Sequence, residues 1–212
     1  MKWVTPNDDG AMEVDKPMRT AWLCGLIGLA LVAGCVKSVP SDSKRVRAAD
    51  YYPLVVGNSW TYDINMLGEQ RSMSVKIDSV ANGFYRDSTG AELVADAFGV
   101  RDQKRYLLRE PIEVGTTWTN VVSVSSVERY QITSAGLPCE SPAGKFDDCV
   151  VVESRNRASD TKTLVNDMTF ARGVGMVRVA MVLENNGQIV PQTTLVLTSY
   201  TAPTVAPAVK TP

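Results

Sequence analysis

Residues 60–66 read Trp-Thr-Tyr-Asp-Ile-Asn-Met, a strict alternation of apolar and polar side chains. Successive residues of a β-strand point to opposite faces, so a period of two places every second side chain on one face. One face then carries Trp60, Tyr62, Ile64 and Met66, and the other carries Thr61, Asp63 and Asn65. The stretch therefore predicts a strand with one buried face and one exposed face.

Most of the remaining chain has the same character, with short runs of β-branched and aromatic residues between turn residues. Asn82-Gly83 and Asn186-Gly187 are hairpin signals, because Asn and Gly accept the positive φ values of a two-residue turn. Pro191 cannot donate to a sheet ladder, so its strand lies at an edge or is bulged there. Further strands are predicted at residues 73–77, 84–85, 105–110, 118–124, 127–133, 146–154, 163–171, 177–183 and 193–200.

These runs give about ten or eleven strands with turns every 8–12 residues or so, which predicts an all-β fold with an antiparallel curved sheet. A half-barrel, a barrel and a sandwich all satisfy the pattern, and each of them curls or covers sheet edges that would otherwise aggregate. Little or no helix is expected in the domain. Residues 91–98 form the one plausible helical segment, and they are short enough to be a strand instead.

Residues 53–61, Pro-Leu-Val-Val-Gly-Asn-Ser-Trp-Thr, have a second copy at residues 111–119, Pro-Ile-Glu-Val-Gly-Thr-Thr-Trp-Thr. Each copy predicts a loop that turns at a glycine and feeds a strand opened by tryptophan. We interpret them as two related units, each starting a β-meander and each placing one tryptophan in the core. Two alternatives remain open here: a coincidence between similar turns, or a ligand site lined by Trp60, Tyr62 and Trp118.

The run from residue 20 to residue 34 carries no charge and ends in small residues directly before a cysteine. As a helix it would span roughly 22 Å, which is short of the hydrocarbon core of about 30 Å and suits a signal peptide. Val32-Ala33-Gly34-Cys35 resembles the lipobox of bacterial lipoproteins. That resemblance implies cleavage before Cys35 and lipid, including palmitate, on its sulfur and new amine. The alternative is an ordinary signal peptide with a chance cysteine.

The expected organisation is a signal peptide at residues 1–34, a lipidated cysteine with a flexible tether at 35–50, a β-domain at 51–201 and a Pro-rich tail at 202–212. Four acidic residues precede Met18 where a signal peptide is basic, so a second interpretation places the true start at Met18. Val36 follows the lipobox cysteine. The lipoprotein resemblance implies retention at the inner membrane when Asp stands there, so Val36 favours the outer membrane.

Cys139 and Cys149 are the two cysteines left beyond the signal peptide and the anchor. An even pair in an exported chain predicts a disulfide. Closing so short a loop contributes about 2.5–3 kcal/mol on the chain-entropy estimate. The alternative, a reactive dithiol, lacks the Cys-x-x-Cys spacing.

The sequence offers few groups for chemistry. It contains no histidine, and residues 35–212 carry 19 basic and 19 acidic side chains without a basic stripe, so no nucleic-acid partner, metal or cofactor is expected. Asp147 and Asp148 point to opposite faces of a strand, which favours surface charge over a catalytic pair. Glu110 and Glu113 flank Pro111, and sequence cannot place them as a glycosidase pair. Arg101, Lys104, Arg105 and Arg109 form either a solvated face or a patch for anionic lipid or polysaccharide.

Three segments resemble a group of uncharacterised exported bacterial proteins. They are Tyr51-Tyr52-Pro53-Leu54 with Gly57 and Trp60-Thr61-Tyr62, then Pro142-Ala143-Gly144-Lys145-Phe146 running into residues 149–152, and residues 171–177. The resemblance implies a curved β-domain without an assigned activity, and it has a distant analogy to half-barrel lipoprotein carriers.

We expect a non-enzymatic envelope lipoprotein, anchored to a membrane through Cys35, that binds an envelope protein or supports assembly. An alternative is a carrier whose curved sheet shelters an acyl chain or another apolar ligand. A carboxylate-based hydrolase ranks third, because it needs two carboxylates at a defined separation.

Overall fold

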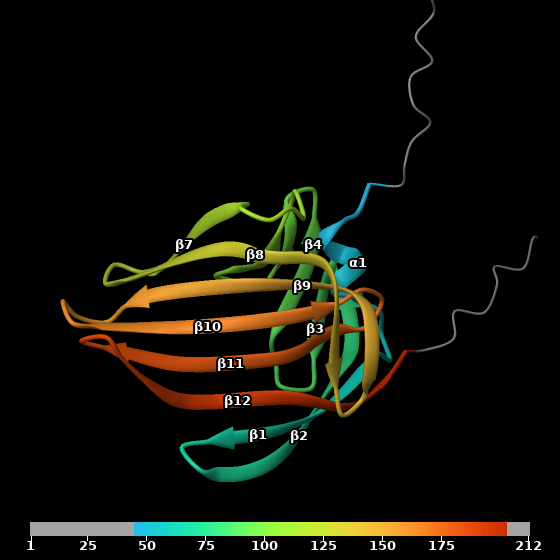
Figure 1. Cartoon of the computed structure of the whole chain (residues 1–212). Helices are drawn as coiled ribbons and strands as arrows, with labels where there is room; N and C mark the ends of the chain where they lie inside the picture. Colours follow the sequence, from blue (N-terminus) through green and yellow to red (C-terminus); the bar gives the residue numbers. More distant parts are fainter. Residues whose placement is uncertain (1–44, 203–212) are drawn as a thin grey trace, which may run out of the picture. The chain divides into compact units, whose positions relative to one another are not determined.

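The structure, a computed structural model, describes residues 45–202, and the strands of this part build one antiparallel sheet (Figure 1). The fold is all-β with a single four-residue helix, as the sequence predicts. The elements are α1 (Ala48–Tyr51), β1 (Ser59–Met66), β2 (Glu69–Ala81), β3 (Phe84–Asp87), β4 (Glu92–Asp96), β5 (Gly99–Arg101), β6 (Tyr106–Arg109), β7 (Thr117–Ser123), β8 (Ser126–Ser141), β9 (Gly144–Arg157), β10 (Lys162–Ala171), β11 (Gly175–Asn185) and β12 (Gln188–Thr201).

The sheet consists of two six-stranded meanders. The spatial order is β6-β5-β4-β3-β2-β1-β12-β11-β10-β9-β8-β7, so each half runs without a crossover and β1 pairs with β12 in the middle. One repeat copy precedes β1 and the other precedes β7. The internal repeat therefore marks the start of each meander.

The sheet curls until its two outermost strands, β6 and β7, lie beside each other. The amide of Asn120 on β7 accepts from the backbone N–H of Tyr106 on β6 and donates to the Tyr106 carbonyl, both at 3.1 Å. The indole of Trp118 donates to the same carbonyl at 2.9 Å. Side chains of β7 thus replace the backbone hydrogen bonds of a strand pair at this junction. They bind the edge N–H and C=O groups of β6 that would otherwise be exposed. We call this junction the seam.

The hydrophobic core lies on the inner face of the curled sheet. The largest fully buried side chains come from both halves and are Phe170, Ile77, Leu108, Ile132, Leu197, Val100, Val150, Val152 and Val177. Trp60, Tyr62 and Trp118 are also buried in this cluster. The inner face of the sheet is therefore packed with the protein's own side chains at this level.

Local turn chemistry follows the sequence expectations. Asn82-Gly83 and Asn186-Gly187 form two-residue hairpin turns with positive φ at both residues. The β11–β12 register shifts so that Val182 faces Pro191, which is the bulge predicted for the strand that holds this proline. Residues 92–96 form strand β4 and not a helix.

The ordered domain begins earlier than residue 51. Ala48 and Tyr51 of helix α1 are buried, so residues 48–50 are packed against the domain and are not part of a free tether. The predicted signal peptide, Cys35, the first part of the tether and residues 203–212 lie outside the described residues. Between residues 45 and 202, no helix has the length and apolar character to cross a bilayer.

Candidate functional site

The two repeat copies adopt the same local structure. The N–H of Gly57 donates to the Ile77 carbonyl and the N–H of Ile77 donates to the Asn58 carbonyl, both at 2.9 Å. In the second copy Gly115 and Thr116 make the same pair of bonds with Ile132, again at 2.9 Å. Each loop thus docks onto the strand that follows its own tryptophan strand.

Both repeat tryptophans stack on a tyrosine, although Tyr52 precedes the first copy and Tyr130 lies opposite Trp118 on β8. Trp60 stacks on Tyr52 and Trp118 stacks on Tyr130, each pair with an interplanar angle of 19°. Each indole N–H donates to a backbone carbonyl, that of Val174 for Trp60 and that of Tyr106 for Trp118. With Tyr62 they lie in the core, which is the interpretation we preferred over a ligand site.

Trp60 explains the glycine at position 175. Its indole lies against Gly175, where an added Cβ would stand 3.0 Å from Nε1 in a backbone conformation of φ +118°. Glycine is therefore required at the β10–β11 turn, since any side chain would meet both backbone strain and the ring. Two of the three segments in the family resemblance meet here.

Helix α1 is tied to the sheet by a cluster of charged and polar groups at the end of the sheet that we call the capped end (Figure 1). Arg172 lies between Asp50 and Asp148, 3.4 Å and 3.3 Å from their carboxylates. The Tyr51 hydroxyl donates to Asp148 at 2.6 Å, and the N–H of Gly173 donates to the Asp50 carbonyl at 2.7 Å. Burial, followed by the bond to Asp148, raises the pKa of Tyr51.

Asp148 is therefore more than a surface turn charge, which corrects our interpretation of the Asp147-Asp148 pair. The two side chains do point to opposite faces, with Asp147 exposed and Asp148 half-buried. Glu110 is also used in packing, because its carboxylate accepts from the backbone of Ala48 and from Arg47 at 3.3–3.4 Å. No contact joins Glu110 to Glu113 within the described residues.

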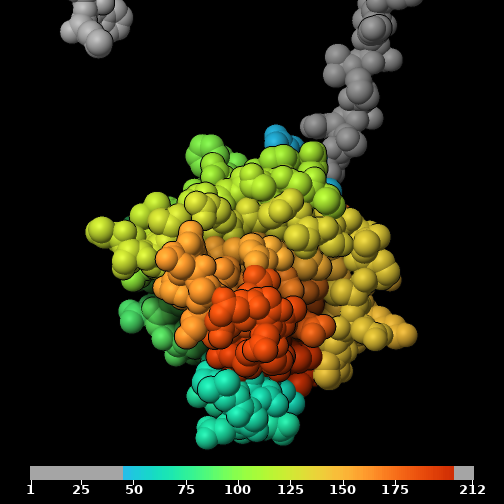
Figure 2. Space-filling model, turned by 60° about the vertical axis from the view of Figure 1, so that its left-hand side comes forward, coloured from blue at the N-terminus to red at the C-terminus, as the bar shows by residue number. Residues whose placement is uncertain are grey.

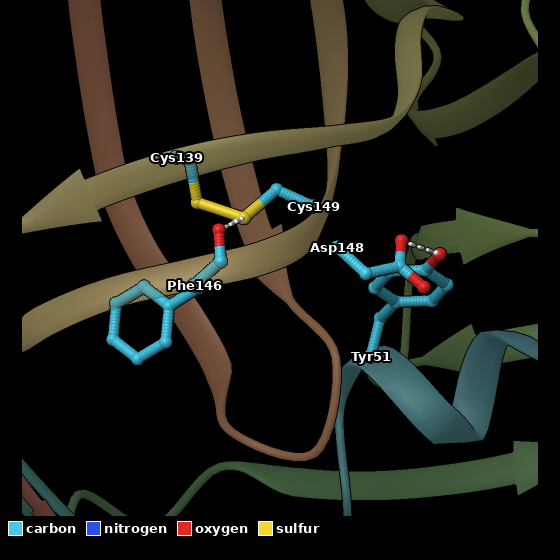
Figure 3. The surroundings of a disulfide bond; sticks show 5 residues. All are labelled: Tyr51, Cys139, Phe146, Asp148 and Cys149. Atoms are coloured by element: carbon cyan, nitrogen blue, oxygen red, sulfur yellow. Dashed lines mark hydrogen bonds between the residues drawn. A yellow bond between two sulfur atoms is a disulfide. The ribbon is translucent and has the colours of Figure 1, made fainter.

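The predicted disulfide joins Cys139 on β8 to Cys149 on β9, beside Asp148 and Tyr51 (Figure 3). Here β8 and β9 extend into a long hairpin whose register with one another shifts three times. The N–H of Ala143 in the hairpin turn donates to the Leu197 carbonyl on β12, and Phe146 packs against Tyr200. The disulfide thus crosslinks a hairpin that curls over the capped end. This hairpin contains the remaining segment of the family resemblance, residues 142–152.

A buried carboxylate lies near the seam. Glu128 on β8 accepts two bonds from the Arg105 guanidinium, at 2.8 Å and 3.0 Å, and one from the Tyr130 hydroxyl at 2.7 Å. Burial alone would raise the pKa of Glu128, but the bonds from Arg105 and Tyr130 outweigh it and hold this pKa below its usual value. The carboxylate is saturated with donors, so its role is to hold β8 against the loop before β6.

The basic residues that suggested a patch are largely engaged within the molecule. Arg101 pairs with Asp96, Arg105 pairs with Glu128, and Arg109 stacks over the Tyr106 ring. A site for an anionic ligand would need these groups free. Of the four, Lys104 has no pairing of this kind among the described contacts.

The opposite end of the sheet carries the turns β1–β2, β7–β8, β9–β10 and β11–β12, and we call it the tip end (Figure 1). Its inner face is looser than the capped end. Leu164 pairs with Leu183 and Asn166 pairs with Met181, and all four side chains are only half-buried. The Asn166 amide donates to Ser154 Oγ at 3.1 Å, while its buried Oδ1 has no hydrogen-bond partner in the described part of the chain.

Shallow hollows elsewhere lie on the outer face. One of about 440 Å³ is lined by Asp63, Asn65, Gln70 and Thr194, with the strand positions between them. Another of about 540 Å³ lies over β7, β8 and β9. Both are open to solvent and have mixed polar and apolar linings. No group of three metal-ligating side chains forms anywhere in residues 45–202. Neither the Glu128 site nor the tip end has a signal in the sequence, since both depend on pairing across distant strands.

No protein-family model matches the sequence, and no curated protein matches it either. Among solved structures, the chain is similar to a proposed lipoprotein of Parabacteroides distasonis, with 13% identity, a TM-score of 0.38, and coverage of 72% of this chain and 98% of the other. It is also similar to a proposed exported protein of Bacteroides fragilis with a YmcC-like fold, with 12% identity, a TM-score of 0.41, and coverage of 72% and 99%. Similarities of this size assign no activity.

Proposed function

We propose that the protein is an envelope lipoprotein. Its β-domain is anchored through a lipid on Cys35 and acts by binding an envelope protein. The observation that carries the proposal is the Cys139–Cys149 disulfide at the capped end. Structural disulfides persist in oxidising compartments, so the pair supports export. The lipobox residues 32–35 then supply a mechanism for export and anchoring together.

The capped end suits attachment. Residue 45 leads into α1, and α1 is held by the Arg172 ion pairs, the Tyr51–Asp148 bond and the Glu110 contacts. A chain that arrives from an anchored cysteine therefore meets the domain at its most crosslinked point. The proposed outer-membrane location rests on Val36 and on the lipoprotein resemblance alone.

The proposed role is non-enzymatic. The carboxylates of Glu110, Glu128 and Asp148 are each bound by donors that hold elements of the fold together. A general acid or base needs a group that can change protonation at the reacting atom near the working pH. Groups saturated by structural donors are poor candidates for that task.

Lipidation of Cys35 is tested by feeding cells labelled palmitate. The parent chain is expected to take up label and to remain with membranes after a high-salt wash, while Cys35→Ser takes up none and is released. Cys24→Ser is the matched control, since it also removes a cysteine of the leader but leaves the lipobox intact, and it should label like the parent. Equal labelling of Cys35→Ser and the parent would reject the proposal.

A second candidate, a carrier of an acyl chain, is favoured by the inner face at the tip end. Half-buried Leu164, Met181 and Leu183 offer apolar contacts, and the Oδ1 of Asn166 could accept from a hydroxyl or carboxylic acid head group. A fluorescent fatty acid added to the delipidated protein should then bind, and Leu183→Asn should weaken its binding. If the probe does not bind the parent protein, this candidate fails and the anchored binding role stands.

A further inference from the structure

Leu67 occupies a position that favours asparagine. Three of the two-residue hairpin turns in the sheet have glycine as their second residue, namely Leu67-Gly68, Asn82-Gly83 and Asn186-Gly187. In all three the first turn residue has a positive φ, between 49° and 52°, and the second is glycine with φ between 80° and 94°. Asparagine is common at such a position, whereas leucine is rare there because its Cβ crowds the backbone.

The leucine is also exposed, so the fold gains little from it. Its side chain is 73% exposed, whereas a leucine retained for stability would normally be buried. A non-glycine residue in the left-handed region is energetically unfavourable, and such outliers cluster at functional sites. An unfavourable backbone conformation and an exposed aliphatic side chain together point to a contact outside the chain.

Two other turns at the tip end carry exposed aliphatic residues. Ile189 on β12 is 67% exposed, and Val124 in the β7–β8 turn is fully exposed. The turns lie along one rim: the N–H of Leu67 donates to the Gln192 carbonyl, and Asn156 bonds Ser126 across β8 and β9. We call Leu67, Val124 and Ile189 the tip aliphatics.

The arrangement fits a lipid surface better than a protein partner. Figure 2 shows the tip end coming forward, with the β1–β2 hairpin as a separate projection below the β11–β12 hairpin. Protein interfaces need a continuous and complementary patch, whereas single side chains on separate turns can each enter the boundary between head groups and acyl chains. Of the residues that flank these turns, Asn65, Ser123, Ser125, Asn186 and Gln188 are uncharged and polar, whereas the exposed Glu69 follows Gly68.

The anchor would keep the tips close to such a surface. This step rests on the proposed function: nine residues separate Cys35 from residue 45, and a chain of that length spans at most roughly 35 Å. A weak apolar contact can then act at high local concentration.

We infer that the tip aliphatics, led by Leu67, form a membrane-contact site that inserts into the interface of a zwitterionic lipid bilayer. The site adds a second, reversible attachment to the covalent lipid, as two signals hold a protein on a membrane more firmly than one. Its binding is apolar, so it does not depend on anionic lipid.

The test uses an unlipidated chain of residues 36–212, so that failure of lipidation cannot affect it. This chain keeps the whole described core, residues 48–197, and the disulfide. It is mixed with phosphatidylcholine vesicles, and bound protein is measured by flotation at about 0.1 M and about 0.5 M NaCl. The higher salt concentration screens surface charges more strongly, so it separates apolar from electrostatic binding. We expect binding that rises with lipid concentration and is equal at both salt concentrations.

Leu67→Asn is the decisive variant, because asparagine suits the turn and should leave thermal stability equal or higher. Its vesicle partition should fall about fivefold, as expected for removing a partly inserted leucine side chain. Leu137→Asn is the matched control. Leu137 is 60% exposed and pairs with Cys149 at the disulfide end of β8, so its loss should leave partition unchanged.

Three results would overturn the inference. The first is that the parent chain does not float with phosphatidylcholine vesicles, and the second is that Leu67→Asn floats as well as the parent. The third is that binding requires anionic lipid and disappears at 0.5 M NaCl, where the Debye length is about 4 Å compared with about 10 Å at 0.1 M. Light scattering adds a fourth: a dimer of the parent that Leu67→Asn converts to a monomer would assign the tips to self-association. None of these results would affect palmitate labelling at Cys35.

Discussion

The capped end and the tip end are built from the same strands, yet they differ in almost every physical respect. The capped end has a disulfide, an arginine held by two carboxylates and a helix. It also has Tyr52 stacked on Trp60 and edge-on to Phe170. The tip end has exposed aliphatic turns and a half-buried inner face. The contrast indicates that stability is concentrated where the chain enters, and the far end is left available for contact.

The largest effect is expected from truncating the core of the capped end. Phe170→Ala removes a fully buried ring and should lower the free energy of unfolding by about 3–5 kcal/mol. Val190→Ala, at the exposed tip end, should change it by less than about 0.5 kcal/mol. Urea unfolding of both variants measures the contrast, and similar losses would show that the two ends do not differ in packing.

Removing the Cys139–Cys149 disulfide should have the next largest effect on the free energy of unfolding. The double variant Cys139→Ser/Cys149→Ser is expected to lose about 2.5–3 kcal/mol of stability through the unfolded state. Reduction of the parent chain with a thiol should produce the same loss, while the reduced double variant shows no further change. A double variant as stable as the oxidised parent would mean that the hairpin is held by its contacts with β12 alone.

Glu128 predicts how stability near the seam depends on pH. Because the folded state lowers the pKa of this carboxylate, its contribution is present above the unfolded pKa of about 4.3 and is lost as pH falls through the folded value. Glu128→Gln should therefore cost about 1–3 kcal/mol at pH 7, with a smaller difference from the parent near pH 3. Unfolding measured at both pH values tests this, and a difference that does not shrink in acid would contradict the assignment.

Tyr51→Phe removes one hydrogen bond to Asp148 and keeps the buried ring of this residue, which ends α1. We expect a loss of about 1 kcal/mol, confined to local opening of the helix. Hydrogen exchange of residues 47–51 should speed up, while exchange in β10 and β11 stays at the parent rate. Tyr200→Phe is the control, because its exposed hydroxyl has no such bond among the described contacts.

The sequence predicts the strands and the repeat well because both depend on local patterns. Alternation in residues 60–66, the Asn-Gly turns and the proline bulge each follow from a few neighbouring residues. The paired loops at Gly57 and Gly115 also show why the repeat is informative: identical spacing produces identical docking on Ile77 and Ile132.

The seam, the capped end and the tip aliphatics could not be predicted in this way. Asn120 meets Tyr106, and Tyr51 meets Asp148, through the curl of the whole sheet and not through spacing along the chain. Asp148 therefore looked like ordinary turn charge, and the arginines looked like a patch before their partners were known. Leu67-Gly68 is a hairpin turn without the usual asparagine, so its position became clear only from the backbone angles.

The contrast between the two ends is tested most directly by hydrogen exchange with mass spectrometry on residues 36–212, with and without phosphatidylcholine vesicles. The account predicts slow exchange around Cys149 and Phe170 in both samples, and fast exchange at residues 63–70 and 186–192 that slows when vesicles are added. Slowing confined to the region of the disulfide, or no change at any turn, would contradict the assignment of the tip end as the contact surface.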